Sequence, residues 1–232
     1  TGITEYPSWI EEVDQVIYYL GASHKSVSII GLSMGATLAL AAAIRNASCL
    51  SLVLLSPVLR FDGWAVPWYY PFLSIIYRLG IRNWHYKESE PYGVKNKELR
   101  RHIRKAVKAN SVSELGAAHL PAKHLFQSLQ LIRATMEDLS EVKTDTLVIH
   151  AIDDETASPK NPELILSKIR SEVRKMIWLG NSYHMITVDN EREIVANEVI
   201  HFLLQEVEKS EAVPKVLGNT PQLIIKNRTE TQ

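Results

Sequence analysis

Short apolar runs alternate along the chain with segments of helical periodicity. Largely apolar runs at 27–30, 50–55, 146–151 and 173–179 predict four strands, of which those at 27–30 and 146–151 have the pattern of buried strands. Apolar positions within 9–20 have helical spacing, and the small residues of 36–43 favour a helix directly after the first strand. Strands that alternate with helices predict an α/β domain with a mostly parallel sheet.

The segment Gly31-Leu32-Ser33-Met34-Gly35 lies between the first predicted strand and its helix. Strand, tight turn and helix is the setting of a nucleophile elbow, in which the serine has a strained backbone. We expect glycine at both flanking positions to prevent clashes. The N-terminus of the helix favours a developing oxyanion, which makes the Met34 N–H a candidate donor. The alternative is a chance match in a loop, but both flanks fit the elbow.

An acid and a histidine follow the two later strands in the order that an elbow serine requires. Asp153, Asp154 and Glu155 come directly after the run at 146–151, and His184 follows the run at 173–179. Loops at the carboxyl ends of parallel strands share one edge of a sheet. Ser33, an acid of this group and His184 are therefore candidates for a catalytic triad.

Together these segments resemble the bacterial carboxylesterase and monoacylglycerol lipase group of the α/β-hydrolase superfamily, over about residues 1–205. The matching segments are 31–35, 150–155 and 183–189. In that group the triad acid precedes a proline, here Pro159, and this register favours Asp154 over Asp153. Two positions depart from the group, because Ala151 and Tyr183 stand where glycine is usual.

The resemblance implies an α/β-hydrolase fold with a core at 1–57 and 145–209, a helical lid inserted at 58–144, and a flexible tail at 210–232. Members of the group begin with further strands and a His-Gly turn that supplies a second oxyanion donor. The chain contains no His-Gly dipeptide. We therefore expect a fragment that lacks the N-terminal part of the sheet, on the order of sixty residues by family analogy.

Aromatic residues are dense in the first part of the expected lid. Trp64, Trp68, Tyr69 and Phe72 are candidate substrate-binding residues, because such side chains can shape an acyl tunnel. The same composition suits a lid that packs on the core or that touches a lipid interface. The basic amphipathic segment 95–108 is interpreted as a solvated lid helix rather than a membrane-surface helix.

Composition and charge limit the classes of partner that the sequence predicts. The 232 residues have zero formal net charge, which argues against nucleic acid. Cys49 is the single cysteine and cannot form an internal disulfide. No acidic or cysteine partners at ligand spacing accompany His119 and His124, and His24, His85 and His201 also lack such partners, so we expect neither a metal nor a cofactor. No apolar run predicts stable membrane insertion. Cytoplasm is the default location, a signal in a missing N-terminus being the alternative, and the oligomeric state is unknown.

The sequence thus predicts a serine hydrolase that cleaves carboxylic esters, either short- to medium-chain acyl esters or monoacylglycerols, through an acyl-enzyme on Ser33. The expected partner is a small-molecule ester or lipid. A thioesterase and a serine aminopeptidase of the same fold are alternatives, since the same machinery cleaves those bonds. A non-catalytic binding protein that keeps the fold is the alternative from another class.

Overall fold

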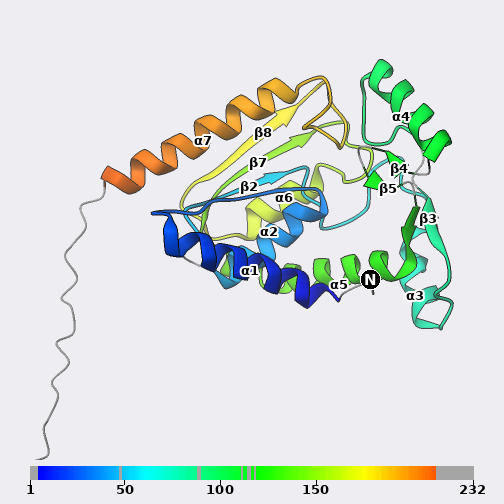
Figure 1. Cartoon of the computed structure of the whole chain (residues 1–232), viewed down its shortest axis with the longest axis horizontal. Helices are drawn as coiled ribbons and strands as arrows, with labels where there is room; N and C mark the ends of the chain where they lie inside the picture. Colours follow the sequence, from blue (N-terminus) through cyan, green and yellow to red (C-terminus); the bar gives the residue numbers. More distant parts are fainter. Residues whose placement is uncertain are drawn as a thin grey trace, which may run out of the picture.

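A computed structural model describes residues 5–46, 49–87, 90–110, 112–113, 116–117 and 119–212. Its central sheet has four parallel strands in the order β1 (Ile29–Leu32), β2 (Ser51–Leu55), β7 (Asp145–Ala151) and β8 (Arg174–Leu179). The four predicted strands are confirmed, the first displaced by two residues toward the elbow. Because all four run in one direction, their carboxyl ends share one edge of the sheet (Figure 1).

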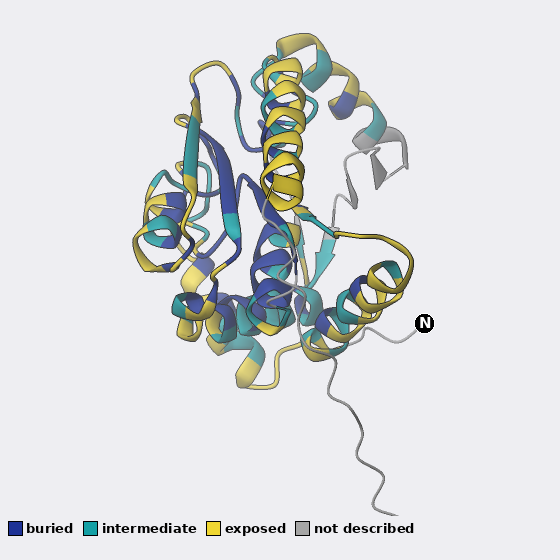
Figure 2. Cartoon of the chain, turned by 90° about the vertical axis from the view of Figure 1, so that its left-hand side faces the viewer, coloured by how far each residue is buried: buried dark blue, intermediate teal, exposed yellow. Residues whose placement is uncertain are grey.

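Helices cover both faces of this sheet. Leu52 and Leu54 of β2 point toward α2 (Met34–Arg45) and α6 (Lys160–Lys168). Val53 and Leu55 point to the opposite face, where α7 (Arg192–Ala212) packs. This alternation is the period of a strand that is buried on both sides. Figure 2 shows the buried residues gathered in the sheet and on the helix faces turned toward it.

Two further helices form an outer layer over α2. Helix α1 (Tyr6–Ser23) and helix α5 (Ala122–Glu137) lie side by side beneath the sheet in Figure 1. Ile10 of α1, Ala41 of α2 and Leu131 of α5 form one buried cluster. Helix α5 falls within the segment expected to be a lid, yet it packs in the same layer as the helices of the core.

The rest of the long connection between β2 and β7 forms a small lobe beyond the carboxyl edge of the sheet (Figure 1). Its elements are η1 (Tyr70–Phe72), α3 (Leu73–Arg78), β3 (His85–Lys87), α4 (Lys97–Asn110), β4 (Val112–Ser113), β5 (Gly116–Ala117) and β6 (His119–Pro121), and η2 (Leu139–Glu141) follows α5. The sequence predicted a helical insertion. In the structure strands β3 and β6 pair in antiparallel fashion, so the lobe contains a small sheet as well as helices.

Two further predictions concern the C-terminal tail and insertion into a membrane. Helix α7 continues to Ala212, so the predicted tail begins as helix, and its remainder lies outside the described residues. Within the part of the chain that the structure describes, none of the helices combines the length and the apolar character needed to cross a bilayer.

Candidate active site

Ser33 lies between β1 and α2 in the strained turn that the motif predicts. Its φ of 56° and ψ of −120° lie in a region that L-residues rarely adopt, a cost of about 1–3 kcal/mol. A Cβ on Gly31 would lie 2.2 Å from the Gly35 carbonyl oxygen, so only glycine fits there. A Cβ on Gly35 would meet nothing within 4 Å. The expectation that both glycines are sterically required is therefore wrong for Gly35.

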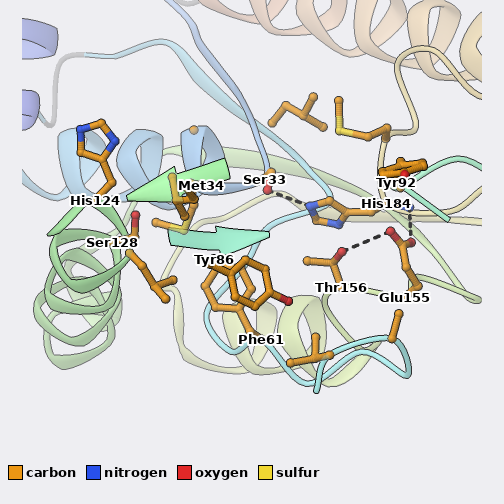
Figure 3. A pocket seen from close by; sticks show the side chains of 18 of the residues that line it. Ser33, Met34, Phe61, Tyr86, Tyr92, His124, Ser128, Glu155, Thr156 and His184 are labelled. Carbon is orange, nitrogen blue, oxygen red and sulfur yellow. Dashed lines mark hydrogen bonds between the residues drawn. The ribbon is translucent and has the colours of Figure 1, made fainter. Parts of the chain in front are cut away.

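His184 lies within hydrogen-bonding distance of both other triad candidates. Its Nε2 is 2.7 Å from Ser33 Oγ, and its Nδ1 is 2.8 Å from Asp154 Oδ2 (the Ser33 contact is dashed in Figure 3). An ionised carboxylate only accepts, so Nδ1 carries the proton and Nε2 is left to accept from the serine. The side chains of Asp154 and His184 are buried, which strengthens both contacts.

The Asp154 carboxylate is fixed by its own loop. Its Oδ1 accepts the main-chain N–H groups of Thr156 at 2.9 Å and Ala157 at 2.8 Å. Burial alone would raise the Asp154 pKa, but His184 and these hydrogen bonds outweigh burial and lower the pKa below its ordinary value. The carboxylate is therefore ionised where His184 needs it.

Asp153, the neighbouring acid, points away from this cluster. Its side chain is 57% exposed and pairs with Lys95 at 2.8 Å. Burial and contact with the imidazole thus distinguish Asp154 from Asp153, whereas the sequence motif alone leaves both as candidates for the triad acid. The position beside His184 belongs to Asp154.

His150, on β7, is a buried histidine that sequence reasoning passed over. Its Nε2 lies 2.8 Å from the Ala157 carbonyl oxygen and 3.5 Å from Asp154 Oδ2. A carbonyl only accepts, so this nitrogen carries the proton and its positive end faces the Asp154 carboxylate. Burial lowers the His150 pKa, which keeps the ring neutral. The signal in the sequence was a polar residue inside an otherwise apolar strand.

Glu155 is a second buried carboxylate beside the triad. Its Oε2 accepts the His184 main-chain N–H at 3.1 Å, and its Oε1 accepts the Thr156 hydroxyl at 3.2 Å (Figure 3). Burial raises the Glu155 pKa. The side chain joins the loop of the acid to the loop of the histidine, a role that its place in the sequence did not reveal.

A cavity of about 640 Å³ opens onto Ser33 and His184. Its wall is largely aromatic and aliphatic, a character suited to an acyl chain. In Figure 3, Phe61 and Tyr86 lie beneath the Ser33–His184 pair. Polar side chains stand at both ends of the view, Ser128 on one side and Glu155 on the side of His184.

The four aromatic residues predicted to bind substrate lie outside this cavity wall. Trp64, Trp68, Tyr69 and Phe72 are 62%, 83%, 45% and 51% exposed. From the same aromatic segment, Ala65, Val66 and Tyr70 line the cavity instead. Some side chains of this segment face the cavity and others face solvent. Its composition alone does not predict which side chains face the cavity.

Met34 is the first residue of α2 and also lines the cavity, so its amide lies at the positive end of the helix beside Ser33. No group of three or more histidine, cysteine or acidic side chains with the arrangement of a metal site occurs among the described residues.

The parallel sheet, the elbow and the histidine loop at its carboxyl edge together define an α/β-hydrolase. The chain belongs to the family described as serine aminopeptidase S33, a family of hydrolases whose model matches residues 2–192.

Known proteins that are similar to this chain include monoacylglycerol lipases and an esterase. A thermostable monoacylglycerol lipase from a Bacillus species is 22% identical over 199 residues, which cover 86% of this chain and 71% of that protein. The structure of a Paleococcus ferrophilus monoacylglycerol lipase superposes with a TM-score of 0.70 at 15% identity, covering 88% and 77% of the two chains. A carboxyl esterase from Bacillus coagulans superposes with a TM-score of 0.65 at 15% identity, covering 89% and 74%.

Proposed function

We propose that the protein hydrolyses carboxylic esters through an acyl-enzyme on Ser33. One observation carries the proposal: Ser33 Oγ, the His184 ring and the Asp154 carboxylate form a continuous hydrogen-bonded line at the floor of an apolar cavity. Relatives named for ester and monoacylglycerol hydrolysis support the same chemistry. Short- to medium-chain acyl esters or monoacylglycerols are the proposed substrates.

The reaction has two steps. His184 Nε2 takes the Ser33 proton as the hydroxyl oxygen attacks the ester carbonyl, and Asp154 stabilises the imidazolium that forms. The Met34 N–H donates to the developing oxyanion. The alcohol leaves with the proton from His184. Water, activated by the same imidazole, then attacks the acyl-serine and releases the acid.

The connection at 58–144 contains the proposed lid. Its part beyond the core layer, as far as β6, supplies Phe61, Tyr70 and Tyr86 to the cavity wall. These side chains suit an acyl chain, because they are uncharged and can bury the apolar surface of the chain.

The test is labelling of the chain with a fluorophosphonate, read by intact mass, followed by hydrolysis of p-nitrophenyl esters from acetate to palmitate. We expect one adduct, which Ser33→Ala abolishes, and an optimum at short or medium chain length. An adduct with preferred cleavage of acyl thioesters or aminoacyl anilides would identify the thioesterase or aminopeptidase alternative. A folded chain that neither labels nor hydrolyses any of these would support the binding-protein alternative.

A further inference from the structure

Asp189, five residues after His184, is a fully buried carboxylate outside the triad. Among the residues that the structure describes, its hydrogen-bond donors are all main-chain N–H groups. Its Oδ2 accepts from Lys95 at 2.7 Å and from Tyr183 at 2.9 Å. Its Oδ1 accepts from Asn96 and from Asn190, each at 2.9 Å.

These donors come from two distant parts of the chain. Tyr183 immediately precedes His184, whereas Lys95 and Asn96 belong to the inserted lobe, where the Asn96 side chain accepts the N–H groups at the start of α4. One carboxylate therefore fixes both the backbone that presents the imidazole and the backbone from which α4 begins. Hydrogen bonds to a charged acceptor are about twice as strong as neutral ones.

Neighbouring contacts join the same two segments. The Met185 N–H donates to the Gly93 carbonyl at 2.8 Å. Gly93 has a φ of +75°, and a Cβ there would lie 2.5 Å from Met185 Cγ. Both residues line the cavity, as does Tyr92. The wall of the cavity on this side is thus built on the segment that Asp189 attaches to the histidine loop.

We infer that Asp189 is a positioning residue that couples the inserted lobe to the catalytic histidine, so that one carboxylate sets both the cavity wall and the placement of His184. This inference rests on the proposed function for its kinetic consequence. The coupling itself has a readout that needs no activity.

Asp189→Asn is the direct test. An amide has one acceptor oxygen, so its NH₂ group must face a pair of main-chain N–H donors, and one pair of hydrogen bonds is lost. Hydrogen exchange of the full chain should show faster exchange in both 94–96 and 183–185. Glu191→Gln is the matched control: Glu191 accepts from Asn181 N–H and the Ser182 hydroxyl in the same loop. It makes no described hydrogen bond to the lobe and acts on it only through its charge, near Lys95. We expect that control to speed exchange only near 180–182.

The kinetic test uses p-nitrophenyl butyrate and decanoate. A displacement of about 1 Å at a reacting group can cost about a hundredfold in rate, and we expect a loss of that order in kcat/KM. Asp189→Asn should lower kcat through His184 and raise KM through the wall, more for decanoate than for butyrate. Glu191→Gln should leave the ratio of decanoate to butyrate kcat/KM as in the wild type.

Gly93→Ala provides a second route that leaves Asp189 intact, since it forces the lobe away from Met185. It should shift KM in the same direction, and the double variant should show less than the sum of the two effects. Faster exchange in the histidine loop alone would overturn the coupling. So would a folded Asp189→Asn with wild-type kinetics, or an unfolded Asp189→Asn together with a kinetically normal Gly93→Ala. A wild-type chain that fails to label at Ser33 would overturn the proposed function, while the exchange data would still decide the coupling.

Discussion

Asp154→Asn is the substitution whose outcome the geometry determines most closely. Oδ1 of the carboxylate accepts two main-chain N–H groups, from Thr156 and Ala157. An asparagine must keep its oxygen there, because its NH₂ would otherwise face two donors. The NH₂ then occupies the position of Oδ2, 2.8 Å from His184 Nδ1. It donates to that nitrogen and forces the ring proton onto Nε2.

An imidazole with its proton on Nε2 cannot accept the proton of Ser33. The same change of tautomer in serine proteases lowers kcat about 10⁴-fold, which corresponds to about 5 kcal/mol of transition-state stabilisation. We expect a loss of that order for p-nitrophenyl butyrate hydrolysis at neutral pH, with KM little changed. Urea unfolding should show that the variant is folded.

The adjacent aspartate supplies the control. Asp153→Asn removes only an ion pair with Lys95 at a largely exposed side chain, and such pairs contribute about 0–1 kcal/mol. Its activity should stay within about threefold of the wild type. If Asp153→Asn lost more activity than Asp154→Asn, or if Asp154→Asn kept more than about a tenth of wild-type kcat, the assignment of the acid would be refuted.

Three further predictions follow from neighbouring residues. Gly31→Ala should cost about 3 kcal/mol or more of unfolding free energy in urea titrations, because its Cβ would overlap a carbonyl, whereas Gly35→Ala should fold and retain activity. Burial raises the Glu155 pKa, so the wild type should lose stability relative to Glu155→Gln as pH rises from about 4.3 through that raised value, and a pH-independent difference between them would contradict this. Phe61→Ala should lower kcat/KM for decanoate about tenfold or more, while exposed Trp68→Ala should leave the chain-length profile unchanged.

The strands and the elbow could be predicted because their signals are local. Apolar runs of strand length bounded by polar residues predicted all four strands, and the spacing around Ser33 predicted the strained turn that the structure contains. The order of the acid and His184 after their strands could be predicted as well, since parallel strands present their carboxyl ends together. What these signals share is that neighbours in sequence determine them.

The rest depends on contacts between distant segments. Glu155 is adjacent to the acid, but its function comes from the His184 main chain, 29 positions away. Which face of the aromatic segment at 64–77 turns inward depends on the packing of Tyr70 against Phe61 and Tyr86, and the sequence of the segment does not predict these contacts. His150 occupies a strand position that a hydrophobic pattern treats as an exception. In each case the sequence shows the type of the amino acid but not the distant residue that it contacts.

Hydrogen bonds join the inserted lobe to the loops of the triad acid and of His184 at two places. The wall of the cavity and the catalytic side chains are therefore held in one arrangement. Near its start, the Gly63 and Ala65 N–H groups donate to the carbonyls of Thr156 and Glu155, each at 3.0 Å, and a Cβ on Gly63 would lie 2.2 Å from the Glu155 carbonyl. Farther along, the segment at 93–96 is held by the histidine loop through Asp189. We expect that a change in the length or side chains of the segment between these anchors would change which ester fits, whereas a change at an anchor would move the acid or the histidine together with the wall. Substrate preference in this protein is therefore expected to be adjustable at Phe61 and between the anchors, but not at the glycines that form them.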